Sequence, residues 1–126
     1  MYVRLLKSKI HQAIITGKDL FYEGSLTLDK ELMEKANLKP FEAVWVYNLN
    51  NGARFETYLI EGKKGEVTLN GAAARLGEIG DKIIITSYAW IDEKDLKNFC
   101  TTIVYLEDLN QIKEIKTIFP FLERNV

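Results

Sequence analysis

The sequence predicts a mainly β fold, in which many short strands form a closed or nearly closed barrel with a few short helices. Short stretches rich in Val, Ile, Tyr and Trp recur along the chain, which is typical of strands. Turn sequences separate these stretches at short intervals, and the helical segments span only one or two turns. This pattern favours a barrel over a parallel sheet, because a parallel sheet needs longer helices between its strands.

The predicted strands follow from these apolar stretches and their turns. They are residues 3–7, 10–16, a segment beginning at 26, and then 43–49, 53–61, 66–69, 82–89 and 101–107. Asp29 is a favourable N-cap for a short helix over 30–37, and residues 72–76 predict a second short helix. All 126 residues are expected to form one domain.

Two turns and the C-terminal segment complete this prediction. Asn51-Gly52 predicts a type I′ hairpin, because both residue types tolerate positive φ. A second turn is expected at 62–65. Residues 109–126 carry isoleucines at helical spacing and are expected to form a partly disordered tail.

Composition and charge exclude several classes of protein. The 17 basic residues balance the 18 acidic ones and lie scattered, so no positive field would attract nucleic acid or an anionic membrane. Charged residues interrupt the N-terminal apolar runs, and the longest apolar stretch, 83–91, is too short to span a bilayer. The single cysteine, Cys100, cannot form an internal disulfide. We therefore expect a small cytosolic protein with no membrane partner.

Common catalytic and cofactor motifs do not occur. His11 is the only histidine, so a metal site built from several imidazoles is excluded and no metal is expected. No glycine-rich nucleotide-binding sequence is present. Ser25 lies in EGSLT and therefore lacks the G-x-S-x-G context of a hydrolase nucleophile. Cys100 lies beside Phe99 without a cationic neighbour, which is typical of a core residue.

Strand periodicity groups some of the polar side chains. Lys9 and His11 have the same parity and would project from one face of an extended strand. Arg54 and Tyr58 share a face for the same reason. Thr57 has the opposite parity and could join them only at a strand end, a bulge or a subunit boundary, and these three options stay open.

Four motifs occur in an order that resembles the pyruvoyl-dependent aspartate 1-decarboxylases. They are K-S-K-I-H at 7–11, Y-E-G-S at 22–25, N-G-x-R-F-x-T-Y at 51–58 and N-G-A-A-A at 70–74. The resemblance covers residues 1 to about 108. It implies a double-psi β-barrel that assembles as a homotetramer, with active sites between neighbouring subunits.

The resemblance also implies that the chain cleaves itself between Gly24 and Ser25. The Ser25 hydroxyl would attack the Gly24 carbonyl, and the matching Thr57 would hydrogen-bond the developing oxyanion. Glycine would allow strained geometry there at little steric cost. Ester formation, β-elimination and hydrolysis would leave a β chain, 1–24, and an α chain, 25–126, that begins with a pyruvoyl group.

This pyruvoyl group is the cofactor that the resemblance implies, in place of pyridoxal phosphate. L-Aspartate would form a Schiff base with it and lose its α-carboxylate as carbon dioxide, giving β-alanine for pantothenate synthesis. By the same resemblance Tyr58 is the proton donor, and Arg54 and Lys9 bind substrate carboxylates. The other residues that match the family's pocket or processing site are Thr57, His11, Tyr22, Asn70, Gly71, Ala72, Ala73 and Ala74.

Two departures and two alternatives accompany this interpretation. The stretch between Tyr58 and Asn70 is shorter than in the best-known members, and Tyr47 stands where some members carry Trp.

A non-catalytic barrel of the same topology would be expected to lack Ser25, Arg54 or Tyr58, and all three are present. A self-cleaving barrel with another small amino acid as its substrate is the other alternative. Some members also need an acetyltransferase-like maturation factor, on which the sequence is silent.

Overall fold

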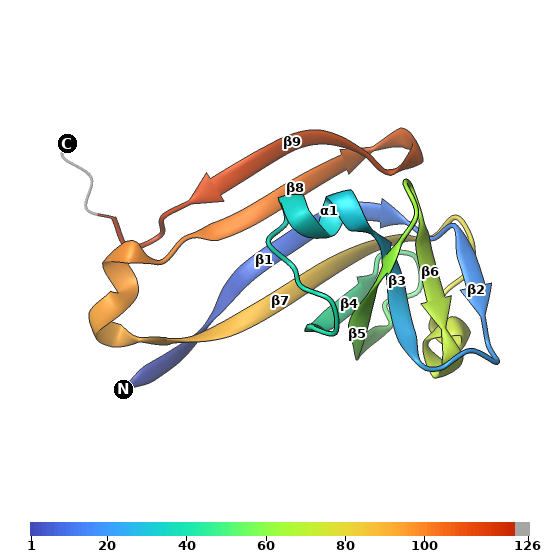
Figure 1. Ribbon diagram of the computed structural model, residues 1–126, viewed down its shortest axis with the longest axis horizontal. Helices are drawn as coiled ribbons and strands as arrows, with labels where there is room; N and C mark the ends of the chain where they lie inside the picture. Colours follow the sequence, from blue (N-terminus) through green and yellow to red (C-terminus); the bar gives the residue numbers. More distant parts are fainter. Residues whose placement is uncertain (123–126) are drawn as a thin grey trace.

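The computed structural model describes residues 1–122, and residues 123–126 lie outside the described part of the chain. It confirms a mainly β fold with a few short helices (Figure 1). The strands are β1 (Tyr2–Ile14), β2 (Gly17–Asp19), β3 (Ser25–Asp29), β4 (Ala43–Asn48), β5 (Arg54–Gly62), β6 (Val67–Asn70), β7 (Lys82–Asp92), β8 (Thr101–Glu107) and β9 (Gln111–Ile118). The helical elements are α1 (Lys30–Lys35) and the 3₁₀-helices η1 (Gly71–Leu76), η2 (Glu93–Asn98) and η3 (Asp108–Asn110).

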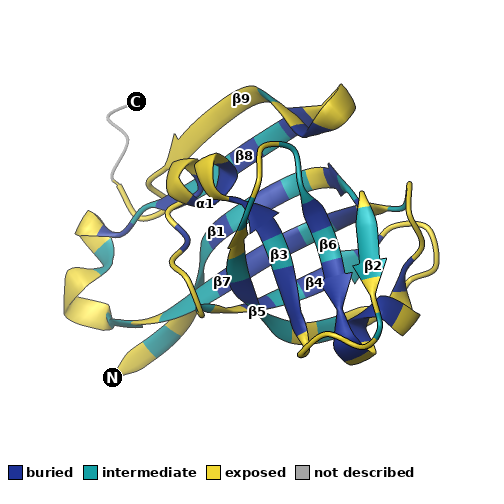
Figure 2. Cartoon of the chain, turned by 45° about the vertical axis from the view of Figure 1, so that its right-hand side comes forward, coloured by how far each residue is buried: buried dark blue, intermediate teal, exposed yellow. Residues whose placement is uncertain are grey.

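The strands form one mixed sheet in the order β2-β6-β3-β5-β4-β7-β1-β8-β9. Three neighbouring pairs, β1–β8, β2–β6 and β3–β5, are parallel, and the others are antiparallel. The sheet curls around a core but stays open at its edge strands, β2 and β9 (Figure 2). Figure 1 shows the long strands β1, β7, β8 and β9 extending from this barrel-like part toward the N-terminus. The predicted barrel-like architecture is confirmed.

Alternating burial along the strands explains why the sheet curls. In β4, Val44 and Val46 are buried on the inner face, whereas Trp45 and Tyr47, which alternate with them, lie on the outer face. The inner faces of the other strands add aliphatic side chains to one continuous core. In Figure 2 this core appears as the dark inner surface of β3, β4, β6 and β7. The outer face of β4 and its neighbours is thereby left polar and aromatic.

The predicted helix after Asp29 is confirmed, although α1 ends two residues earlier than expected. The Asp29 carboxylate accepts hydrogen bonds from the backbone N–H groups of Glu31 and Leu32, at 2.8 and 3.4 Å. These bonds satisfy donors at the helix N-terminus that have no partner within the helix. Leu32 and Met33 then point into the core. None of the helices in residues 1–122 is long and apolar enough to cross a membrane.

Two local predictions were wrong. Residues 3–7 and 10–16 belong to the single strand β1, which accommodates irregular pairing with β7 around residue 7 and again after Ile10. The β4–β5 turn is not type I′, because among residues 49–52 only Gly52 has positive φ, at 77°. Instead the Asn48 side chain accepts bonds from the N–H groups of Asn50 and Asn51, at 2.8 and 3.3 Å.

The expectation of a partly disordered C-terminal tail was also wrong for most of that segment. Residues 111–118 form β9, which pairs antiparallel with β8. Ile112 lies opposite Leu106 and Ile115 opposite Val104, so an extra residue on β9 separates the two isoleucines by three positions. This irregularity makes the Ile112–Ile115 interval resemble helical spacing, whereas Ile118, opposite Thr101, faces the other side of β9. Residues 123–126 of the predicted tail lie outside the described part of the chain.

Candidate active site

Ser25 begins β3 and lies directly opposite Asn70, the last residue of β6. Its side chain is fully buried. The Asn70 amide donates a hydrogen bond to Ser25 Oγ at 2.9 Å and another to Thr27 Oγ1 at 2.8 Å. Ser25 Oγ in turn donates to the Glu23 carbonyl oxygen at 3.2 Å. The hydroxyl at position 25 is therefore fixed from both sides.

Gly24, on the other side of the same peptide bond, is exposed and packs against Gly71. A Cβ at Gly71 would lie 2.7 Å from Gly24 Cα and 2.8 Å from Gly24 N, closer than real contacts allow. Gly71 also has a φ of +64°, which other residues adopt at a cost. Position 71 thus requires glycine so that the backbone before Ser25 can pass.

The pairing of β5 explains how Thr57 and Tyr58 can both face this bond. β5 pairs with β4 up to Tyr58 and then with β3, where Leu59 lies opposite Leu26 in a parallel ladder. Continuing that ladder backward places the Gly24–Ser25 bond beside Thr57 and Tyr58. Thr57 therefore lies inside β5, where the strand changes its partner from β4 to β3, and neither at a strand end nor at a bulge in the β4–β5 ladder. A subunit boundary at Thr57 stays a prediction.

A shallow pocket of about 390 Å³ opens at this point. Its lining residues are Gly24, Phe55, Glu56, Thr57, Tyr58, Ala72, Ala73 and Leu76. The Tyr58 ring packs against the exposed Phe41 ring, with 5.8 Å between their centroids. The pocket therefore brings three groups together. The Gly24 peptide bond is a candidate for cleavage, the Thr57 hydroxyl can stabilise an oxyanion, and the Tyr58 phenol can donate a proton.

Lys9, His11 and Arg54 do not line this pocket. Lys9 on β1 lies opposite Thr86 of β7, and β4 separates β7 from β5. Three strand spacings amount to about 14 Å, so Lys9 lies well away from β5 within one chain. Arg54 is exposed, and its guanidinium carbon lies 4.1 Å from the centre of the Tyr47 ring. The structure thus divides the predicted residues into two groups.

His11 belongs to this second group and has an unusual environment. Its ring meets the Tyr105 ring edge to face at 5.7 Å, and its buried Nδ1 has no hydrogen-bond partner among the described residues. Burial, and then the nearby charge of Lys9, lower the pKa of His11. The imidazole is therefore neutral at pH 7. Tyr22 is more than half exposed, and its carbonyl oxygen lies beside Gly71.

Several residues near the site were not predicted from the sequence. Phe55 and Glu56 lie between predicted site residues and line the pocket with Leu76. The N-G-x-R-F-x-T-Y motif contains the first two, so the motif itself was the available signal. Tyr88 approaches Tyr47 on the outer face of the sheet, and only strand pairing could indicate that contact.

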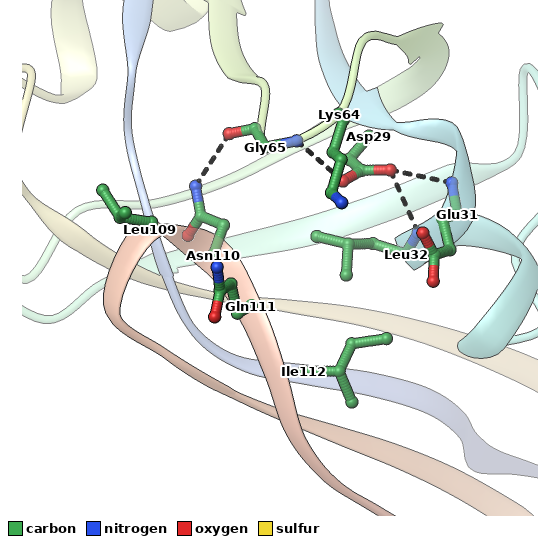
Figure 3. Close-up of a pocket in the computed structure, with 9 residues that line it drawn as sticks. All are labelled: Asp29, Glu31, Leu32, Lys64, Gly65, Leu109, Asn110, Gln111 and Ile112. Atoms are coloured by element: carbon green, nitrogen blue, oxygen red, sulfur yellow. Dashed lines mark hydrogen bonds between the residues drawn. The ribbon is translucent and has the colours of Figure 1, made fainter.

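A second pocket, of about 360 Å³, lies between α1 and the β8–β9 connection (Figure 3). Two of its polar side chains, those of Asp29 and Asn110, are already hydrogen-bonded within the fold. Asp29 accepts from the N–H of Gly65 at 2.7 Å, and Asn110 donates to the carbonyl of Gly65 at 3.1 Å. Asn110 also bonds both backbone groups of Ile14. This arrangement ties η3 and the 62–65 turn to β1, so we interpret the pocket as structural.

The residue types that bind metals are spread over the fold. Among residues 1–122, no group of three or more His, Cys, Asp or Glu side chains is arranged to hold a metal ion. Cys100 is a free, half-buried thiol. The polar groups at the Gly24–Ser25 pocket are the hydroxyls of Ser25 and Thr57, the Tyr58 phenol, the Asn70 amide and the Glu56 carboxylate.

The fold and the site define a small, barrel-like β protein whose pocket is built around a single glycine–serine bond. Residues 1–113 match the family model described as aspartate decarboxylase. The chain is 61% identical over 121 residues to an aspartate 1-decarboxylase of a Sulfurihydrogenibium species, covering 94% of this chain and 90% of that protein. It is 60% identical to that of Persephonella marina over 86% of this chain and 79% of the relative. It is 52% identical to that of Leptospira biflexa over 90% and 99%.

The chain belongs to the aspartate decarboxylase family. The match extends over β1 to β8 and into β9, so it includes every residue of the two groups described above.

Proposed function

We propose that this protein decarboxylates L-aspartate at its α-carboxylate, giving β-alanine and carbon dioxide for pantothenate and hence coenzyme A synthesis. We further assign the electrophile to a pyruvoyl group formed from Ser25 by self-cleavage. One observation carries the proposal best. The Ser25 hydroxyl is buried and fixed by Asn70, at a peptide bond that opens into a pocket with Thr57 and Tyr58.

The residues present fit a pyruvoyl group at position 25. A small keto group would occupy the volume of the serine side chain, which the sheet already encloses. The Asn70 amide, 2.9 Å from Ser25 Oγ, could donate to an oxygen of that group. Ala72 and Ala73 keep the adjacent wall of the pocket small, which leaves space for a bound amino acid.

Self-cleavage would begin with attack of Ser25 Oγ on the carbonyl carbon of Gly24. The Oγ proton points to the Glu23 carbonyl, and Asn70 holds the oxygen next to the bond. Thr57 in the same pocket would donate to the oxyanion at Gly24. The Gly24–Ser25 C–N bond then breaks as the ester forms, and β-elimination releases the carboxylate of Gly24. Hydrolysis of the remaining dehydroalanine releases ammonia.

In the decarboxylation itself, the chain's side chains would bind, orient and protonate. When formed, the pyruvoyl ketone would hold the substrate amine and accept the electron pair released with carbon dioxide. Tyr58, which lines the pocket, would return a proton to the substrate carbon from its hydroxyl group. Arg54 and Lys9 would bind the two carboxylates of aspartate, and two cations favour a dianionic substrate.

The separation of the two residue groups supports a homotetramer whose active sites lie between subunits. Within one chain, Lys9, His11 and Arg54 do not line the pocket at Gly24: Lys9 lies three strands from β5, and Arg54 packs on Tyr47. A neighbouring copy could bring its outer face to this pocket. Coexpression of Ser25→Ala and Arg54→Ala chains tests this idea. Restored activity in the mixture, with neither variant active alone, would support shared sites.

The experiment that tests the function is incubation of the purified protein with ¹³C-labelled L-aspartate, with L-glutamate in parallel. We expect labelled β-alanine and carbon dioxide from aspartate, and no product from the Ser25→Ala variant. Product from glutamate only would favour the alternative of another small amino acid, and a cleaved protein without any product would contradict the proposed reaction. Repeating the maturation with and without added cell lysate would show whether a maturation factor is needed in the cytoplasm, where we place the reaction.

A further inference from the structure

The outer face of the sheet carries a row of four side chains, in which two neighbouring phenols are flanked by two arginines. The row runs from Arg54 through Tyr47 and Tyr88 to Arg4. The two guanidinium carbons lie 4.1 and 4.3 Å from the centres of the Tyr47 and Tyr88 rings. The two phenol oxygens are 2.8 Å apart and share a hydrogen bond. These four side chains come from four different strands, β5, β4, β7 and β1.

Strand pairing places this row on one face of the sheet. Tyr47 lies directly opposite Arg54 on one side and Ile84 on the other, and Arg4 lies opposite Trp90. Ile84, Tyr88 and Trp90 have the same parity, so the contacts of Tyr88 with Tyr47 and Arg4 run diagonally across that face. Thr86 lies on the same face of β7, between Ile84 and Tyr88, and its Oγ1 is 3.4 Å from the hydroxyl oxygen of Tyr47. Because paired residues face the same side of a sheet, the row shares its face with Lys9, which lies opposite Thr86. The row therefore contains Arg54 and shares its face with Lys9, the two cations that the proposed function assigns to carboxylate binding.

Arg54 is held in a way that leaves its hydrogen-bond donors free. Among residues 1–122 its guanidinium has no ion pair or side-chain hydrogen bond, and the contact that orients it is with the ring face of Tyr47. Stacking uses the flat face of the guanidinium, whereas a carboxylate binds along its edge. The same arginine can therefore be fixed by Tyr47 and still bind a carboxylate with two parallel hydrogen bonds.

We propose that Tyr47 and Tyr88 are positioning residues that preorganise Arg54 for the carboxylate of a dicarboxylate substrate. Tyr47 provides the platform, and its bond with Tyr88 fixes the far end of the ring. This inference depends on the proposed function, in which Arg54 binds substrate. It goes beyond that function because it assigns a role to the phenol pair.

The test measures two quantities for each variant of the mature, full-length protein. The first is KM and kcat for L-aspartate, and the second is the calorimetric Kd for succinate, a dicarboxylate without the reacting amine. Loss of the ring in Tyr47→Leu is expected to raise KM and Kd about 5- to 20-fold, with little change in kcat. Tyr47→Trp, which keeps an aromatic face, should restore both. Tyr2→Leu, at an exposed tyrosine elsewhere on β1, is the matched control and should change neither.

The hydroxyl pair is tested separately. Tyr47→Phe and Tyr88→Phe each keep the ring and lose the shared bond, so each should raise Kd for succinate about two- to fivefold. The double variant should be no weaker than either single one, because both remove the same interaction. In an Arg54→Ala background, Tyr47→Leu should have no further effect. A merely structural role would instead lower thermal stability and leave succinate binding unchanged.

The outcomes separate the two proposals. One outcome would overturn this inference alone. In it, the wild-type protein converts aspartate and binds succinate, and a folded Tyr47→Leu variant has KM and Kd values within about twofold of the wild-type values. If Tyr47→Leu does not fold, unchanged succinate binding by Tyr88→Phe would overturn it in the same way. Wild-type protein that neither converts aspartate nor binds succinate would contradict the proposed function and this inference together.

Discussion

The side-chain amide of Asn70 lies 2.9 Å from the hydroxyl oxygen of Ser25 and donates a hydrogen bond to it in the buried interior of the β3–β6 pair. The same amide reaches Thr27 at 2.8 Å. One side chain therefore fixes two hydroxyl groups at the start of β3. If Ser25 attacks its own backbone, the orientation of its oxygen depends on this amide.

Replacing Asn70 with alanine should both slow self-cleavage and destabilise the fold. The buried Ser25 hydroxyl and the half-buried Thr27 hydroxyl would lose a donor, which costs about 1–3 kcal/mol of the free energy of unfolding. Time courses of chain cleavage on denaturing gels and urea denaturation would measure the two effects. Asn98→Ala, at an exposed asparagine in η2, is the control and should change neither. Cleavage at the wild-type rate in a folded Asn70→Ala variant would contradict the role of this bond.

Replacing Gly71 with alanine should block cleavage more strongly than it lowers stability. The new Cβ would push against Gly24 from 2.7 Å and displace the carbonyl that Ser25 must reach. Gly52→Ala is the matched control, since Gly52 also has positive φ, +77°, but has no atom within 4 Å of the added carbon. Both variants should lose about 1 kcal/mol from backbone strain. If Gly71→Ala and Gly52→Ala cleave equally fast, contact with Gly24 is irrelevant to the reaction.

Tyr58→Phe should cleave itself normally but make β-alanine about 100-fold more slowly, or slower still. The substitution keeps the ring packed against Phe41 and removes only the hydroxyl group that would supply the proton. Comparing the extent of cleavage with kcat for aspartate separates maturation from turnover. Turnover at the wild-type rate would remove Tyr58 from the donor role.

Glu42 provides a prediction for the pH dependence of stability. Burial disfavours its charge, but hydrogen bonds from Lys7, Ser87 and the Lys39 backbone, together with the Lys7 charge, lower its pKa below the ordinary value of 4.5. A carboxyl group with a lowered pKa stabilises the fold fully above its unfolded-state pKa. That contribution is then lost as the pH falls below 4.5 and through the lower value.

Glu42→Gln should therefore be less stable than wild type at pH 7, and the difference should shrink as the pH falls from about 5 toward about 3. Chemical denaturation at several pH values would measure it. Glu31→Gln, at an exposed side chain on α1, is the control. A difference between Glu42→Gln and wild type that stays constant across this range would show that the Lys7–Glu42 contact contributes no pH-dependent stability.

Local sequence signals predicted most of the fold because they act over a few residues. The Asp29 cap and the alternation of Val44 and Val46 each depend on near neighbours. The errors arose where pairing partners decide the outcome. In β9, an irregularity in the ladder with β8 puts Ile112 and Ile115 three residues apart although both pair on one face. Strand β1 stays one strand because β7 pairs along its length.

The candidate site was only partly predictable for the same reason. The ordered motifs indicated Gly24, Ser25 and Tyr58, but the position of Thr57 depends on β5 changing partners from β4 to β3. The contact between Tyr47 and Tyr88 joins residues 41 positions apart and has no local signal. The separation of Lys9 from the pocket likewise became visible only with the order of the strands.

The proposed chemistry depends throughout on Ser25 breaking its own backbone and becoming a keto group. Intact-mass measurement of the purified wild-type protein, before and after reduction with borohydride, is the decisive test. We expect two fragments, 1–24 and 25–126. The larger one should be lighter by one ammonia than a fragment beginning with serine, and it should gain two hydrogens on reduction. A single unbroken chain of unmodified mass that borohydride does not change would contradict self-cleavage and the keto group alike.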